Sequence, residues 1–156
     1  MAAEVGRPAP EFELDGTDDT PEGHRRYRLA DYRGQVVVLV FYPGDNTPVC
    51  TRQLNAYTDD IQQFADVGAQ VLAISPQSVQ SHDDFSCKQG GFGFPLLADT
   101  DKSVGEAYGI LGPLGFYRRS VFVVDKEGVV RWAHKAVAGI TFRSTAELVE
   151  AVRAAG

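Results

Sequence analysis

A run of seven residues, Val36 to Tyr42, constrains the fold of this chain more than any other feature. All seven are β-branched, aliphatic or aromatic, which is typical of a strand buried on both faces of a sheet. The turn-forming residues 43–46 follow, and apolar residues then recur at helical spacing as far as Gly68. A second apolar run comes at 71–74. Strand, one amphipathic helix and strand predict two parallel strands joined by a right-handed crossover.

The first 30 residues predict a small hairpin ahead of this unit. Two stretches of alternating polar and apolar residues, 11–14 and 26–29, flank the turn-rich residues 15–23. This pattern is typical of two antiparallel strands. We therefore expect a polar hairpin appended to the main fold. In the middle of the chain, a weaker helical segment runs from 78 to about 89, and a short helix is expected at 104–108.

The C-terminal part predicts a second hairpin and a closing helix. Apolar runs at 120–125 and 129–134 flank the turn sequence 126–128. Ser144 and Glu147 stand three residues apart ahead of an apolar stripe, as in a capping box. The order β-α-β, connecting helices, β-β-α predicts an α/β protein with a thioredoxin-like fold, in which helices flank a central mixed sheet.

Length and composition favour one soluble domain spanning residues 1–156. A chain of 156 residues suits one core, and 44% hydrophobic with 23% charged residues is ordinary for such a protein. The net charge of −6 comes without a basic cluster, so nucleic acid is not an expected partner. No stretch resembles a secretion signal or a membrane span. Two cysteines are too few for a secreted disulfide scaffold. We expect a cytoplasmic protein.

Cys50 is the strongest candidate for chemistry. Thr47 suits the N-cap of the predicted helix and Pro48 suits its first position, which places Cys50 in the first turn. A reactive cysteine works as a thiolate, and the unpaired N–H groups and dipole of a helix start favour an anion. The Thr47 hydroxyl could cap the helix and face the sulfur, and Pro43 could shield it from water. The alternative is a buried, inert cysteine.

The residues from Phe41 to Thr51 resemble a known active-site motif. Pro43, Thr47 and Cys50 match the pattern Pro-x-x-x-Thr-x-x-Cys of the peroxiredoxins. The wider chain is most similar to the bacterioferritin comigratory protein, or peroxiredoxin Q, subfamily. The resemblance implies a thiol peroxidase in which Cys50 attacks hydrogen peroxide or an organic hydroperoxide. It places the family's catalytic arginine at Arg119, with the adjacent Arg118 as the alternative.

The resemblance also implies a second thiol that resolves the oxidised Cys50. Many subfamily members carry this cysteine five residues after the first, where this chain has Asn55. Others carry it in the following helix, and Cys87 falls in that segment. The alternative interpretation of Cys87 is a half-exposed helix residue. Gln53 stands where related proteins often have Glu, which keeps the shape of the polar network but removes a charge.

Two other functions remain open from the residues alone. A general thiol–disulfide oxidoreductase uses Cys-x-x-Cys at the helix start, and Thr47 occupies the first of those positions here. A one-cysteine peroxidase, redox relay or chaperone-like protein would leave Cys87 a bystander. The family resemblance implies thioredoxin or a similar dithiol as reductant and a monomeric state. No cofactor and no metal are expected, since the histidines lack metal-ligand spacing.

Overall fold

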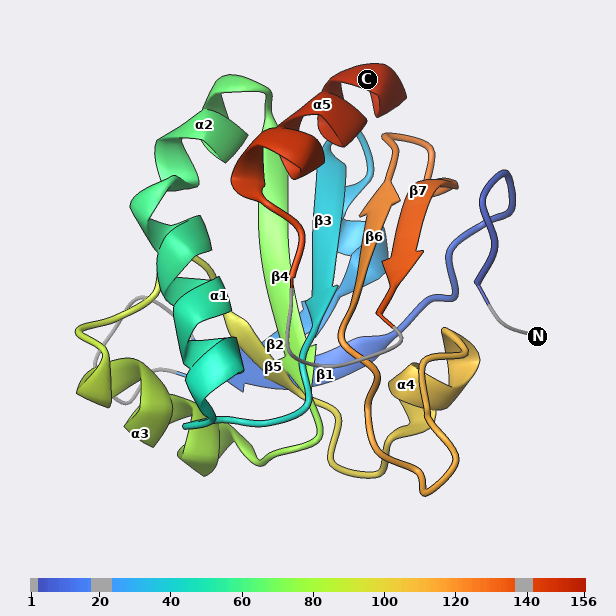
Figure 1. The fold of residues 1–156 in the computed structure, drawn as a ribbon. Helices are drawn as coiled ribbons and strands as arrows, with labels where there is room; N and C mark the ends of the chain where they lie inside the picture. Colours follow the sequence, from blue (N-terminus) through green and yellow to red (C-terminus); the bar gives the residue numbers. More distant parts are fainter. Residues whose placement is uncertain (1–2, 18–23, 137–141) are drawn as a thin grey trace.

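The computed structural model describes residues 3–17, 24–136 and 142–156, and its centre is a seven-stranded mixed sheet (Figure 1). The spatial order of the strands is β2-β1-β5-β4-β3-β6-β7. The strands are β1 (Glu13–Thr17), β2 (His24–Arg28), β3 (Val36–Phe41), β4 (Ala69–Ser75), β5 (Leu96–Ala98), β6 (Ser120–Val124) and β7 (Val130–Lys135). The predicted thioredoxin-like α/β fold is confirmed.

β3 lies inside the sheet, between β4 and β6, and both of its faces meet apolar partners. Val38 and Val40 belong to one buried core, whereas Leu39 and Phe41 belong to a second core on the opposite face. β3 is parallel to β4 and antiparallel to β6. The buried central strand and the parallel crossover that the apolar runs predicted are both confirmed.

Helices cover the two faces unequally (Figure 1). α1, α2 and α5 pack against the face that holds Val38, whereas α4 and the segment before β1 contribute to the opposite core. α3 contacts β5 and β1 near one edge of the sheet. The helices are α1 (Pro48–Asp59), α2 (Ile61–Asp66), α3 (Val79–Lys88), α4 (Ser103–Ala107) and α5 (Thr145–Ala155), with a 3-10 turn at Leu29–Tyr32.

One expectation about the first half of the chain is wrong. The predicted single helix up to Gly68 is two helices, because Asp60 adopts a non-helical backbone that ends α1 and begins α2. Neither Gly nor Pro marks this break, so the apolar periodicity runs through it.

The predicted N-terminal hairpin is confirmed, since β1 and β2 pair antiparallel. It is added at one edge of the main sheet, where Gly16 of β1 lies opposite Leu97 of β5. Of the predicted turn at 15–23, residues 15–17 belong to β1 and residues 18–23 lie outside the described residues.

The C-terminal elements agree with the sequence. β6 and β7 form the predicted antiparallel hairpin. Ser144 caps α5, since its hydroxyl accepts a hydrogen bond from the Glu147 N–H at 3.2 Å. Because β6 runs antiparallel to β3, Ser120 lies opposite Phe41. The residues just before β6 therefore meet the residues just after β3, and this junction holds the predicted site.

Candidate active site

Cys50 lies in the first turn of α1 and is fully buried. Pro48 is the first helical residue, and Thr47 is the extended residue ahead of it, as predicted. The first-turn N–H groups of a helix have no partner within the helix, and their partial positive charge stabilises an anion close by. The start of α1 therefore brings partial positive charge close to the Cys50 sulfur.

Arg119 supplies a full positive charge at the same sulfur. It precedes β6 and is buried, with 4% of its surface exposed. Its Nη2 donates a hydrogen bond to Cys50 Sγ at 3.2 Å. Arg118 points elsewhere, and its Nε donates to the Ala136 carbonyl at 3.2 Å. The alternation of side chains along an extended segment separates the two arginines, and the sulfur receives the guanidinium of Arg119.

A neutral network holds the Arg119 guanidinium in place. Its Nη1 donates to Gln53 Oε1 at 2.5 Å, and Gln53 Nε2 contacts the Tyr57 hydroxyl at 3.4 Å. Tyr57 donates in turn to the Arg143 carbonyl at 2.6 Å. Burial raises the pKa of Tyr57 to about 12, so the phenol stays neutral. Gln53 thus accepts from Arg119 without bringing a negative charge to the guanidinium.

Thr47 and Pro43 lie in the loop between β3 and α1. The Thr47 hydroxyl donates to the Gly44 carbonyl at 3.0 Å and does not cap α1. The expected side-chain cap is therefore wrong: the Thr47 hydroxyl is turned toward the Gly44 carbonyl and accepts no hydrogen bond from the first turn of α1. Thr47 is exposed and Pro43 is half-buried. Both residues come from the segment that leads directly into the Cys50 turn.

Cys87 lies on α3 and is exposed, whereas Cys50 is buried. Neither cysteine forms a disulfide. The structure therefore shows the reduced state of both thiols. On the same helix, Phe85 and His82 are fully buried. α3 is held to the molecule by these two side chains on its inner face, while Cys87 faces solvent.

The structure adds two residues that sequence reasoning missed. Asp45, in the loop before Cys50, contacts His82 of α3 through Oδ2 and Nδ1 at 2.7 Å, and both side chains are almost fully buried. The available signal was the spacing of His82 and Phe85, three residues apart on one helix face. A polar residue at an inward-facing position requires a buried partner.

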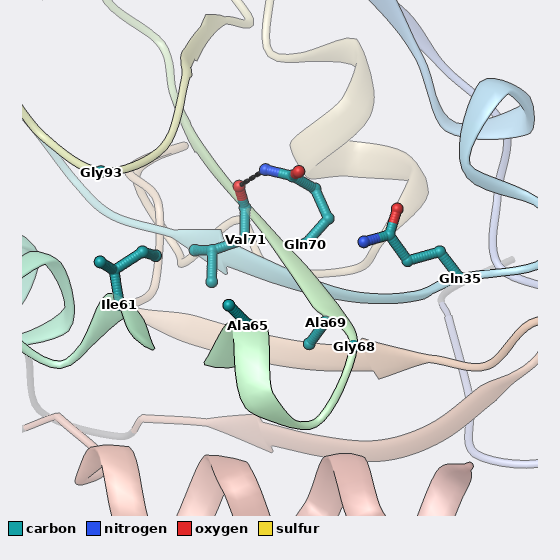
Figure 2. A pocket seen from close by; sticks show the side chains of 8 residues that line it. All are labelled: Gln35, Ile61, Ala65, Gly68, Ala69, Gln70, Val71 and Gly93. Atoms are coloured by element: carbon teal, nitrogen blue, oxygen red, sulfur yellow. Dashed lines mark hydrogen bonds between the residues drawn. The ribbon is translucent and has the colours of Figure 1, made fainter. Parts of the chain in front are cut away.

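The hollow in Figure 2 lies away from this site. It has a volume of about 290 Å³ and is lined by Gln35, Ile61, Ala65, Gly68, Ala69, Gln70, Val71 and Gly93. Gln35 and Ala69 stand at the starts of β3 and β4, whereas Cys50 follows the end of β3. The hollow therefore belongs to the opposite end of the sheet.

A buried thiol at a helix start, held against a guanidinium on this fold, defines a thiol-dependent redox protein. The AhpC/TSA family model matches residues 5–133. The chain therefore belongs to the AhpC/TSA family, whose members include the peroxiredoxins named among its relatives.

Several relatives cover most of the chain. Rat peroxiredoxin-2 is 39% identical over 136 residues, which span 83% of this chain and 68% of the relative. A protein of the rubredoxin operon of Clostridium pasteurianum is 34% identical over 161 residues, or 97% of this chain and 90% of its own. The crystal structure of reduced Plasmodium vivax 2-Cys peroxiredoxin matches with a TM-score of 0.88 and 25% identity, over 96% of this chain and 80% of that one.

The described ranges, 3–17, 24–136 and 142–156, bear on membranes and metals. None of the helices there is both long and apolar enough to cross a bilayer. Within the same ranges, no three His, Cys, Asp or Glu side chains gather as a metal site would require.

Proposed function

We propose that this protein is a thiol peroxidase in which Cys50 reduces hydrogen peroxide or an organic hydroperoxide. The Cys50 thiolate attacks one peroxide oxygen, so that an S–O bond forms and the O–O bond breaks. Sulfur loses two electrons and becomes a sulfenic acid. The departing hydroxide or alkoxide takes a proton from the solvent and leaves as water or an alcohol. Membership of the family and the geometry at Cys50 both support this reaction.

The observation that carries the proposal is the 3.2 Å contact from Arg119 Nη2 to Cys50 Sγ in a buried site. A guanidinium remains protonated at any physiological pH, and a buried charge acts more strongly than a solvated one. It stabilises the thiolate before attack and the negative charge that moves onto the departing oxygen during attack. An inert core cysteine has no need of a buried arginine.

Thr47 and Pro43 complete the proposed site. The Thr47 hydroxyl donates its hydrogen bond to the Gly44 carbonyl. Its oxygen lone pairs therefore remain to accept a hydrogen bond from the O–H of a peroxide. That contact orients the peroxide toward Cys50. Pro43 has no N–H and a rigid ring, and in this proposal it limits the access of water to the sulfur.

Cys87 is the proposed resolving thiol. Its sulfur displaces the hydroxyl of the Cys50 sulfenic acid, which forms a disulfide and releases water. A disulfide tolerates at most about 7 Å between the two Cα atoms, and here one thiol is fully buried and the other exposed on a different helix. The step therefore requires α3 to open locally.

Recycling completes the cycle. A thioredoxin-like dithiol would reduce the disulfide by thiol–disulfide exchange and itself become a disulfide, in the reducing cytoplasm that we expect. The motif around Cys50 supports placement with the peroxiredoxin Q subfamily, and that resemblance also underlies the proposed monomeric state.

The decisive experiment is a coupled assay. Purified protein with thioredoxin, thioredoxin reductase and NADPH should consume peroxide at a rate proportional to its concentration. The same preparation should fail to reduce insulin disulfides, which a general oxidoreductase would do, and should fail to suppress aggregation of an unfolded client. Insulin reduction without peroxide consumption would overturn the proposal.

Replacement of Cys87 tests its proposed role. Cys87→Ser should leave the first oxidation of Cys50 at the wild-type rate but abolish the intramolecular disulfide, because the sulfenic acid then has no partner thiol in the chain. Non-reducing mass spectrometry after one equivalent of peroxide should show a Cys50–Cys87 peptide in wild type only. If the variant cycles with thioredoxin as fast as wild type, Cys87 is a bystander and the enzyme works with one cysteine.

A change at Gln53 tests the electrostatics. Gln53→Glu places a carboxylate on the Arg119 guanidinium, where it competes with the Cys50 thiolate for the same positive charge. We expect the alkylation of Cys50 by iodoacetamide at neutral pH to slow by about three- to tenfold, as for a charge added beside an ionised group. Gln62→Glu adds the same charge on exposed α2 and should leave this rate unchanged.

A further inference from the structure

Asp45 and His82 form the centre of a buried hydrogen-bond network. His82 Nε2 lies 2.9 Å from the Leu97 carbonyl, which only accepts, so Nε2 carries a proton. His82 Nδ1 lies 2.7 Å from Asp45 Oδ2. The Asp45 side chain also accepts hydroxyl hydrogen bonds from Tyr42 at Oδ1 and from Ser81 at Oδ2, each at 2.7 Å. Several partners therefore fix both residues at once.

The pair is removed from water. The His82 side chain has 0% and the Asp45 side chain 1% of its surface exposed. Burial first, and then the Asp45 carboxylate, raise the pKa of Tyr42 well above its ordinary value, so Tyr42 remains a hydrogen-bond donor to Asp45. A buried hydrogen-bonded pair is costly to break, because breaking it leaves polar groups unpaired away from water.

The pair joins two segments that the reaction uses. Asp45 lies in the loop that carries Pro43 and Thr47 into the Cys50 turn, and its backbone N–H donates to Gln77 Oε1 at 3.0 Å, just before α3. His82 lies on α3, five residues before Cys87. The same carboxylate thus ties the loop beside the peroxidatic thiol to the helix that carries the second thiol.

We propose that Asp45 and His82 are positioning residues that lock the Cys50 loop to α3, so that α3 opens only when this buried contact breaks. The contact has two consequences. It holds the loop for peroxide attack, and it keeps Cys87 on the closed α3, away from Cys50. The kinetic part rests on the proposed peroxidase function, whereas the closure of α3 does not.

Hydrogen exchange of the reduced protein tests the lock without peroxide. His82→Phe keeps a planar ring but removes the nitrogen that contacts Asp45, so the double variant Asp45→Asn/His82→Phe, in which the new amide needs no such partner, guards against misfolding. In the double variant we expect amides of 79–88 and of the Cys50 loop to exchange about tenfold faster or more, as for a locally opened segment. Amides of β3 and β4 should keep their wild-type rates.

His24 provides a matched control. His24 of β2 contacts Asp83 of α3, the helix that also carries His82, but the His24 side chain is 45% exposed. His24→Gln should leave α3 exchange unchanged, because exposed ion pairs contribute little. Unchanged exchange in the double variant, or equal acceleration in β3 and β4, would overturn the lock.

Two further measurements separate positioning from simple stability. Nitrogen-15 NMR of the reduced protein should show one fixed His82 ring with a proton on Nε2, and a ring whose two nitrogens average would overturn the buried contact. In rapid-quench mass spectrometry the double variant should form the Cys50 sulfenic acid about tenfold more slowly, because the loop is no longer held, yet form the disulfide faster. Sulfenic acid formation at the wild-type rate would overturn positioning. If wild type itself forms none, the proposed peroxidase fails, and hydrogen exchange still decides the lock.

Discussion

Cys50→Ser is expected to reduce peroxide turnover to less than about one per cent of wild type, a loss of at least ~3 kcal/mol in transition-state stabilisation. A serine hydroxyl stays protonated in this site and is a far weaker nucleophile than a thiolate toward oxygen. The helix start and Arg119 stabilise an anion that serine does not form. The coupled thioredoxin assay with hydrogen peroxide measures the effect.

The control for this substitution is a test that the variant keeps the wild-type fold. Cys50 is fully buried, so circular dichroism and thermal unfolding of the variant must match wild type before the rates are compared. Cys87→Ser, which removes one thiol from an exposed site, controls for the number of cysteines. Turnover by Cys50→Ser above about one per cent would mean that another group carries the reaction.

The second large effect is expected at Arg119. Arg119→Ala removes the donor to Cys50 Sγ and leaves Gln53 Oε1 without its 2.5 Å partner. We expect the second-order rate of Cys50 oxidation to fall by about 10²–10³-fold, the effect of removing one charge-stabilising donor from an active site. Stopped-flow reaction with peroxide gives this rate, and alkylation as a function of pH reports the loss of thiolate.

Arg118→Ala is the matched control, because Arg118 is the neighbouring residue and carries the same charge. Its guanidinium donates to the Ala136 carbonyl and not to the sulfur, so oxidation should slow by less than about threefold, as for a charge outside the site. A larger effect at Arg118 than at Arg119 would exchange the proposed roles of the two arginines.

The fold and the centre of the site could be predicted because they depend on local sequence. The apolar run at 36–42 requires a strand covered on both sides, and Thr47-Pro48 begins a helix whatever surrounds it. Together they place Cys50 at a helix start. Arg119 is the member of its basic pair closest to β6, so the motif resemblance and the strand register indicate the same residue.

Other features depend on which distant segments meet. The break at Asp60 has no Gly or Pro to signal it, and β1 joins the main sheet only because Gly16 lies beside Leu97. The Thr47 hydroxyl donates to the Gly44 carbonyl because the loop folds back on itself. The preference of threonine for helix N-caps does not predict this contact.

The Asp45–His82 pair shows most clearly what tertiary structure decides. The two residues are 37 positions apart and look like a turn aspartate and a helix histidine when each is read in its own segment. Packing α3 beside the Cys50 loop removes both from water, and two buried polar residues must then satisfy their hydrogen bonds on each other and on their neighbours. Sequence by itself determined the strand, the helix start and the position of Cys50 in its first turn. The tertiary structure decided their charged partners, because the free energy of a buried charge depends on the side chains that surround it.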